Sequence, residues 1–286
     1  MGDKSILRGI SFPDIKVKIF YSGAFDRARD GQVHSKICRH AIFARATTGR
    51  YEISCGDGRH ADLEPGEAFL TGANLPLRIV HHGDPDHGRQ MSAHWLHMHY
   101  TLFGTLDITS LLDLPLRVSA ADCEPFSAII TELQNMDQDT PDDLRQVVRR
   151  QELAFRTLRL LCDLAPMRAD ADMLLHQHDR LAVVIRYMND HLGDRLTVSD
   201  LAAKACLSLP RFHAWFRQLT GQAPMEYFKQ LRLSEAGRLL VAGDQSLRDV
   251  AEATGFCNEF HFSRDFRRAY GKPPGRWRRE YTPGLA

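Results

Sequence analysis

Two stretches near the C-terminal end of the chain carry side chains that could contact a DNA duplex. In each stretch, polar and basic residues recur at intervals of three or four between aromatic residues, which places them on one face of a helix. An arginine on such a face can donate two hydrogen bonds to a guanine, and other cations can contact phosphates. These side chains are His213, Ala214, Arg217 and Gln218 in the first stretch, and Glu259, Ser263, Arg264, Arg267 and Arg268 in the second.

Both stretches belong to a motif that occurs twice. Residues 197–221 recur as residues 246–271, first with an offset of 49 residues and then with an offset of 50, so the second copy has one extra residue in its turn. Each copy opens with Ser or Thr followed by Asp three residues later, which predicts a capping box at a helix start. The pairs are Thr197 with Asp200 and Ser246 with Asp249.

A second helix is predicted in each copy, with Ser208 and Asn258 as its N-caps. The opposite face of this helix is apolar and is expected to lie in the core. Its residues are Phe212, Phe216 and Leu219 in the first copy, and Phe262, Phe266 and Ala269 in the second. A duplicated helix-turn-helix is typical of a DNA-binding protein with two recognition helices.

Residues 180–283 resemble the DNA-binding domain of the AraC/XylS family of bacterial transcription regulators. The resemblance rests on Gly255-Phe256, Phe262-Ser263-Arg264, Phe266-Arg267-Arg268, Tyr270-Gly271-Lys272-Pro273-Pro274 and Trp277-Arg278. It implies two helix-turn-helix units joined by a long helix over residues 224–240. By position, it implies base contacts from Pro210, His213 and Ala214, and from Glu259, Ser263 and Arg264.

The first helix departs from the usual polar residues of the family. Pro210 and Ala214 offer no side-chain hydrogen bond, so we expect this helix to discriminate bases weakly. It would do so through a methyl contact from Ala214 to a thymine and a hydrogen bond from His213. Arg264 is expected to be the strongest base contact, whereas Arg217 and Arg267 suit phosphates.

The charge of the chain is divided unevenly. The whole chain has 37 Lys and Arg and 36 Asp and Glu, a net charge of +1. Residues 180–286 contain 17 basic and 11 acidic residues, a net charge of +6, which leaves −5 for residues 1–179. The positive charge therefore lies in the part predicted to bind DNA, and binding should weaken with salt.

From about residue 33 to residue 103, short apolar segments alternate with turn residues, which predicts a β-sandwich or barrel. Residues 61–76, with Pro65-Gly66, resemble the hairpin of cupin-like sensor domains, which precede the DNA-binding domain in many AraC-type regulators. Residues 94–116 resemble sugar-responsive members, so a carbohydrate effector is expected. Residues 1–32 have no periodic pattern, and could form an arm over the barrel or a first strand.

Histidines are concentrated in this half, where 11 of the 14 lie before residue 180. His97 and His99 would share one face of a strand. A cupin metal site would need a further histidine just after Pro76, where Leu77 stands, so no metal site or other cofactor is predicted. These histidines could instead hydrogen-bond within the barrel, or contact an organic effector. The candidate effector-binding residues are Arg39, His94, Trp95, His97 and Tyr100.

Residues 122–164 have helical periodicity, interrupted at residues 137–143. One apolar stripe comprises Phe126, Ile129, Ile130 and Leu133, and a second comprises Leu144, Val147, Val148, Phe155, Leu158 and Leu161. These helices could pack on the barrel or on a second subunit, as similar regulators do when they form homodimers. The predicted domains are therefore a cupin-like β-domain (1–121), a helical dimerisation or packing region (122–164), a linker (165–179) and the DNA-binding domain (180–286).

Six cysteines without paired spacing suit a reducing cytosol, and the chain starts without a signal-peptide core or any apolar run of membrane-spanning length. A cytoplasmic protein that does not contact membranes is expected. The predicted fold class is α+β multidomain, with a cupin-like β-barrel or jelly roll and flanking helices followed by an all-α double helix-turn-helix domain.

The predicted function is sequence-specific regulation of transcription, more often activation, under the control of a small-molecule effector. The expected partners are promoter or operator DNA, the effector, RNA polymerase and a second copy of the chain. No enzymatic activity is expected. The alternatives are a metal-dependent cupin enzyme that carries a DNA-binding appendage, and a nucleoid-type DNA binder without an effector.

Overall fold

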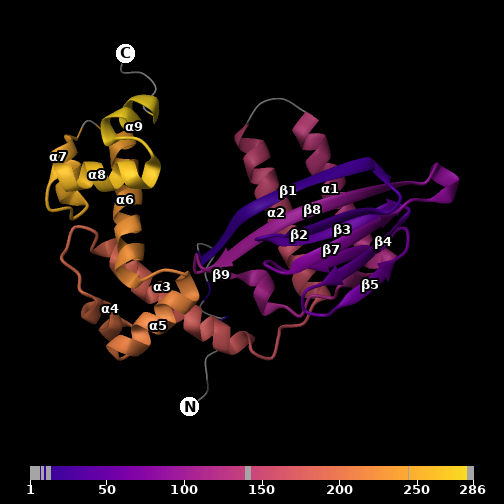
Figure 1. Ribbon diagram of the computed structural model, residues 1–286, viewed down its shortest axis with the longest axis horizontal. Helices are drawn as coiled ribbons and strands as arrows, with labels where there is room; N and C mark the ends of the chain where they lie inside the picture. The colour runs from indigo at the N-terminus through magenta and orange to yellow at the C-terminus, as the bar shows by residue number, and fades with distance from the viewer. Residues whose placement is uncertain (1–6, 8–9, 11–13, 139–142, 244, 282–286) are drawn as a thin grey trace. The chain divides into compact units, whose positions relative to one another are not determined.

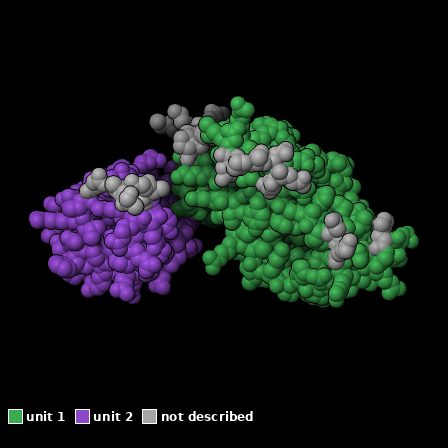
Figure 2. Space-filling view, turned by 90° about the horizontal axis from the view of Figure 1, so that it is seen from above, with its two compact units in different colours: residues 1–176 green, residues 177–286 purple. Residues whose placement is uncertain are grey.

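The protein consists of two compact units, residues 1–176 and 177–286 (Figure 2). The computed structural model describes residues 7, 10, 14–138, 143–243 and 245–281. Among these residues, all the strands belong to the first unit, and the second unit is helical. The prediction of an α+β chain with an N-terminal β-domain and a C-terminal all-α domain is confirmed.

The first unit contains two antiparallel sheets. The larger sheet has the strand order β1-β8-β3-β6-β10, with β9 paired to β8, and the smaller sheet has the order β2-β7-β4-β5 (Figure 1). The strands are β1 (Ile15–Arg29), β2 (Gln32–Ile37), β3 (Ala41–Thr48), β4 (Arg50–Cys55), β5 (His60–Leu63), β6 (Ala68–Thr71), β7 (Pro76–His82), β8 (Gln90–Leu102), β9 (Leu106–Asp107) and β10 (Arg117–Val118). Two short 3-10 helices, η3 (Pro85–His87) and η4 (Ile108–Leu111), flank β8 and β9.

Strand β1 settles, for residues 15–29, the alternative between an arm and a first strand; most of residues 1–13 lies outside the described residues. The strand pairs with β8 along its length, from Ile15 opposite Leu102 to Arg29 opposite Gln90, and is therefore a first strand of the larger sheet. The pairing shifts between Val17 and Ile19, an irregularity that helps to explain why no simple alternation is visible in the sequence.

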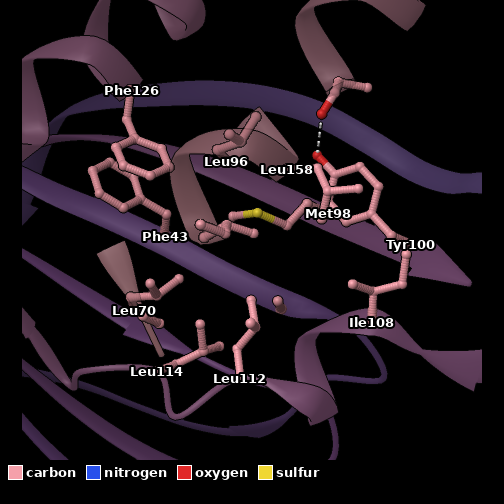
Figure 3. Close-up of a cluster of buried hydrophobic side chains, with 14 of the residues drawn as sticks. Phe43, Leu70, Leu96, Met98, Tyr100, Ile108, Leu112, Leu114, Phe126 and Leu158 are labelled. Carbon is pink, nitrogen blue, oxygen red and sulfur yellow. Dashed lines mark hydrogen bonds between the residues drawn. The ribbon is translucent and has the colours of Figure 1, made fainter. Parts of the chain in front are cut away.

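The larger sheet is buried on both faces, by the smaller sheet on one side and by helices on the other, and successive strand residues enter these two cores in turn. On β3, Ile42 packs in the core between the two sheets, whereas Phe43 packs in a second core against helices α1 (Ala120–Gln138) and α2 (Leu144–Leu164). Phe43 stacks on Phe126 of α1 with ring centroids 4.6 Å apart (Figure 3). This two-sided burial fixes which strand residues can face a ligand between the sheets.

Helix α1 follows its predicted stripe, but α2 follows its stripe only in part. Phe126, Ile129, Ile130 and Leu133 are all buried. On α2, the core begins at Leu153, and the preceding apolar residues Leu144, Val147 and Val148 are 75%, 50% and 60% exposed. The first turns of α2 thus leave an apolar surface uncovered among the described residues of this chain.

The segment expected to be a linker is largely helical. Helix α3 (Ala171–Asp190) includes residues 171–179 of the predicted linker at 165–179. Leu175 of this helix is buried in the core of the first unit, whereas Leu181, Val184 and Met188 are buried in the second. Residues 171–179, which were predicted to be part of a linker, therefore belong to a helix with buried apolar residues.

The second unit contains two small cores that share one helix. Its remaining helices are α4 (Val198–Lys204), α5 (Leu209–Thr220), α6 (Pro224–Ala242), α7 (Leu247–Ala253), α8 (Glu259–Tyr270) and α9 (Pro274–Tyr281). Phe228 of α6 packs with α3, α4 and α5, whereas Leu233 and Leu240 pack with α7 and α8. Figure 1 shows α4 and α5 near one end of α6 and α7 to α9 near the other. Helix α6 thus holds both helix-turn-helix units on one body.

Candidate functional site

Helices α4 and α7 begin with the predicted capping boxes. Thr197 accepts a hydrogen bond from the backbone N–H of Asp200, whose carboxylate accepts one from the N–H of Thr197. Ser246 and Asp249 form the same pair. These caps fix the first helix of each unit and, through it, the packing of the second.

The face of α5 that points away from the core contains half of the residues predicted to contact DNA. Phe212 and Phe216 are fully buried, and Pro210, His213, Ala214 and Arg217 are all exposed. Ser208 occupies the N-cap position as expected, but its side chain makes no capping hydrogen bond. Pro210 in the first turn needs no N–H partner, so the helix begins without that bond. Leu209, 44% exposed, adds to the apolar character of this face.

The exposed face of α8 is more polar than that of α5, although two phenylalanines are buried in the same way. Phe262 and Phe266 are buried, Glu259, Arg264 and Arg267 are exposed, and Ser263 is half-buried. Asn258 caps the helix by accepting a hydrogen bond from the N–H of His261 at 2.9 Å. The structure therefore brings the four predicted residues of α8 together on one helix, with Ser263 closest to the core.

Arg264 is an exposed candidate whose side chain contacts two neighbouring residues on α8. Its side chain is 69% exposed, its Nη2 lies 3.1 Å from Nδ1 of His261, and its Nε lies 3.6 Å from the carboxylate of Asp265. Such exposed contacts are weak and can be exchanged for a contact with a base. Among the described residues, no acidic side chain lies within ion-pair distance of Arg217 or Arg267. These two guanidinium groups are therefore free to meet phosphates.

A cavity of about 240 Å³ lies between the two sheets of the first unit. Trp95 and His97 of β8 line it, as the sequence predicted for a ligand pocket. The other residues around it are Phe25, His34, Lys36, Ile42, Ala44, Tyr51, Phe69, Ile79 and His81. A Cβ atom at Gly23 would lie 2.0 Å from the Trp95 ring, so glycine is needed at that point of β1 for the indole to keep its place.

Burial lowers the pKa values of two histidines in the cavity, His81 and His97. Burial, together with the charges of His40 and Lys36, lowers the pKa of His97 to about 4. Burial also lowers the pKa of His81, although the hydrogen bond of its Nδ1 with the carbonyl of Gln32 opposes this. Lys36 is the one lysine or arginine among the described residues that line the cavity.

The structure places the other candidate effector-binding residues elsewhere. Tyr100 lies on the opposite face of β8, fully buried under α2, where its hydroxyl donates a hydrogen bond to the carbonyl of Ala154 at 2.8 Å (Figure 3). His94 also belongs to the alternate set of β8 residues, and Arg39 lies between β2 and β3. Neither is among the described residues that line the cavity. Strand alternation separates His94 and Tyr100 from Trp95 and His97.

The histidine cluster around His97 does not form a metal-binding arrangement within the part of the chain that the structure describes. No group of three or more His, Cys, Asp or Glu side chains there is placed to hold a metal ion. His97 contacts His40 through a ring nitrogen and stacks on Tyr21 with centroids 5.0 Å apart. All six cysteines are free thiols.

Comparison with known proteins places this chain in a family. Residues 201–280 match the family of the helix-turn-helix domain. The chain is 38% identical over 94 residues to YobQ of Bacillus subtilis, an uncharacterized HTH-type transcriptional regulator, and covers 39% of that protein with 33% of its own length. It is 29% identical over 160 residues to RhaS of Citrobacter koseri, an HTH-type transcriptional activator, with 55% of each chain covered. The chain belongs to the AraC family.

The AraC-type part of the chain also matches a solved DNA-binding domain. The DNA-binding domain of the global transcription factor AdpA, solved in complex with a target DNA, is 36% identical, with 36% of this chain and 92% of that chain covered and a TM-score of 0.35. The chain spans about half the length or less of the curated relatives given above. Among its described residues, no helix combines the length and apolar character needed to cross a membrane.

The structure adds two α8 residues that the sequence reasoning missed. Phe260 is 86% exposed on the first turn of α8, and His261 is exposed beside Arg264. The offset of 50 residues pairs Pro210 with Phe260, and not with Glu259, so the repeat itself contained this signal. A large exposed aromatic on the recognition helix of an AraC-family protein is a candidate for apolar contact with a thymine methyl group.

Proposed function

We propose that this AraC-family protein is a sequence-specific regulator of transcription that inserts α5 and α8 into successive major grooves, about 34 Å apart on one face of a duplex. The proposal rests mainly on one observation: each of these helices has one face buried in the core and one face exposed to solvent. On each helix two phenylalanines fill the core, and the other face ends in an exposed arginine, Arg217 or Arg267, that has no acidic partner among the described residues.

The two helices contribute unequally. Arg264 donates to a guanine, Glu259 can accept a hydrogen bond from a cytosine amino group, and Phe260 contacts a thymine methyl group. On α5, His213 is the main hydrogen-bonding side chain, with apolar contact from Ala214 and Pro210. Arg217 and Arg267 contact phosphates, which fixes the register of both helices.

The first unit is proposed to bind a small-molecule effector in the cavity between its sheets. The effector changes DNA binding only if it has different affinities for two arrangements of the protein. Activation, through contact with RNA polymerase, is favoured by the description of the RhaS relatives as activators. A homodimer is favoured by the uncovered apolar turns of α2 around Leu144 and Val148.

Selection of genomic DNA fragments by the purified full-length protein tests this proposal. The expected result is enrichment of discrete sites, each with two sub-sites about one helical turn apart. Affinity for these sites should fall steeply with salt, because several phosphate contacts release counterions. A double variant, Arg217→Ala with Arg267→Ala, is the control that should lower affinity for all sequences alike. Enrichment no better than random would overturn the proposal.

A further inference from the structure

Few kinds of polar side chain line the cavity. The lining combines one ammonium group, three imidazoles and several aromatic and aliphatic side chains. Among the described residues that line it, none is Asp, Glu, Asn or Gln. A carbohydrate presents many hydroxyl groups that need both donors and acceptors, and carboxylate and amide side chains are the usual acceptors for them. The lining therefore suits a ligand with few hydroxyl groups.

Lys36 lacks a counter-ion within the described part of the chain. It is half-buried on β2, and no Asp or Glu side chain there lies within ion-pair distance of its ammonium group. Lys36, His81 and His97 all line the same cavity, so a ligand there can meet the ammonium group and the imidazoles together. A partly buried cation without a partner favours the binding of an anion beside it.

The rest of the cavity lining is mainly aromatic and aliphatic, and several of its rings contact one another. The His34 and His81 rings lie 4.8 Å apart, the Tyr51 and His81 rings 5.3 Å apart, and the Trp95 and His97 rings 5.0 Å apart. The volume of about 240 Å³ equals that of roughly eight water molecules at about 30 Å³ each, which is enough for one aromatic ring or a short aliphatic chain.

We propose that the cavity binds a small organic carboxylate with one aromatic ring or a short aliphatic chain, and that Lys36 is its counter-ion. This inference rests on the proposed role of the first unit as an effector-binding domain, and it replaces the carbohydrate expected from the sequence. The carboxylate accepts hydrogen bonds from Lys36 and from an imidazole N–H, and the ring or chain packs against Trp95 and Phe69.

Matched pairs of an acid and its neutral amide test the proposal on the full-length protein. The probes are benzoate with benzamide, phenylacetate with phenylacetamide, and hexanoate with hexanamide, with glucose as a neutral sugar, and binding is followed by calorimetry and by NMR of the histidine rings. At least one acid is expected to bind with a Kd of about 1 mM or tighter, and about tenfold or more tightly than its amide. The proposal is overturned if no acid binds in this range, or if amides bind as tightly as acids.

Variants of Lys36 separate charge from packing. Lys36→Met keeps most of the apolar stem and should weaken acid binding about tenfold or more, whereas Lys36→Arg should retain the preference for acids. Lys16→Met is the matched control, because Lys16 is exposed on β1 and does not line the cavity. Equal acid binding by wild type and Lys36→Met would overturn the proposal.

DNA binding measured in the same samples distinguishes this inference from the proposed function. Glucose binding in place of the acids, with a change in DNA affinity, would overturn the carboxylate inference and support effector control. An acid that binds through Lys36 without changing DNA affinity would support the carboxylate site and contradict effector control.

Discussion

The two helix-turn-helix units have the same buried frame and different exposed faces. Phe212 and Phe216 fill the first core as Phe262 and Phe266 fill the second. Outside the core, Ala214 and Arg264 occupy the same position of the repeat, and so do Pro210 and Phe260. The comparison teaches that packing fixes where each recognition helix lies, while the residues free of packing determine what it can discriminate.

The turns of the two units differ as well. Cys206 adopts a positive φ of 52°, where the second copy has Gly255 with a φ of 71°. A Cβ atom at Gly255 would lie 2.5 Å from the Arg232 guanidinium and 2.6 Å from the carbonyl of Leu192, whereas the first copy has a cysteine at this position. The first turn therefore tolerates a strained cysteine, and the second cannot accept a side chain.

The largest expected effect tests whether the two cores are equivalent. Phe216→Ala and Phe266→Ala should each lower the free energy of unfolding of the second unit by about 3–5 kcal/mol, because each removes a fully buried ring. Chemical denaturation of the full-length variants, followed by circular dichroism, measures both. A loss at only one of the two positions would contradict the equivalence.

A second prediction concerns base discrimination. Arg264→Ala should weaken binding to the selected site by about 1–3 kcal/mol and relax the preference at one base pair. His213→Ala in the first unit should cost less, about 1 kcal/mol or below. Fluorescence anisotropy with the selected site and with point variants of it measures both. If Arg264→Ala weakened binding equally on all DNA sequences, Arg264 would be a phosphate contact and not a base contact.

Substitutions at the turn positions Cys206 and Gly255 should affect the stability of the second unit unequally. Gly255→Ala should destabilise the second unit by at least about 1–2 kcal/mol, because a side chain is disfavoured at positive φ and the site is crowded. Cys206→Gly should change stability by less than about 1 kcal/mol, since relief of strain and loss of backbone restriction oppose each other. Thermal unfolding of both variants would reveal equal shifts if the two turns were in fact alike.

The capping boxes should contribute equally. Thr197→Ala and Ser246→Ala are each expected to cost about 1 kcal/mol of stability, since each removes one cap hydrogen bond at the start of a helix. The matched control is Ser208→Ala, which should have little effect because Ser208 makes no capping bond. Urea unfolding of the three variants decides whether the caps differ.

Acid should weaken both caps together. Hydrogen bonds from Thr197 and Ser246 hold the pKa values of Asp200 and Asp249 below their ordinary value. A lowered carboxyl pKa stabilises the fold at neutral pH, and this contribution is lost as the pH falls below about 4 and through the folded-state pKa values. NMR titration of the two carboxyl groups should show both values below that of a free Asp; an ordinary value at either one would contradict its capping role.

Much of the second unit could be predicted from the sequence, because the repeat shows each local signal twice. The two capping boxes follow from Ser or Thr with Asp three residues later, and the buried phenylalanines and exposed arginines follow from helical periodicity. Phe260 was missed although the repeat pairs it with Pro210, because an apolar residue is usually assigned to the core; the structure leaves it 86% exposed.

The cavity was harder to predict because it depends on long-range pairing of strands. Lys36 and His81 lie far apart in sequence and meet only through the pairing of β2 with β7. Tyr100 was assigned to the pocket by its nearness in sequence to Trp95 and His97, but alternation along β8 directs it to the helices. The helical course of residues 171–179 was masked by their polar composition.

The most direct test of the central claim is saturation mutagenesis of the best selected site, with the affinity of the full-length protein measured for every single base change. Two sub-sites about one helical turn apart are predicted. Changes in the sub-site assigned to α8 by its response to Arg264→Ala should each cost about 1–3 kcal/mol, and those in the other sub-site should cost less. Equal costs in both sub-sites, or larger costs opposite α5, would contradict the claim that the two helices discriminate bases unequally.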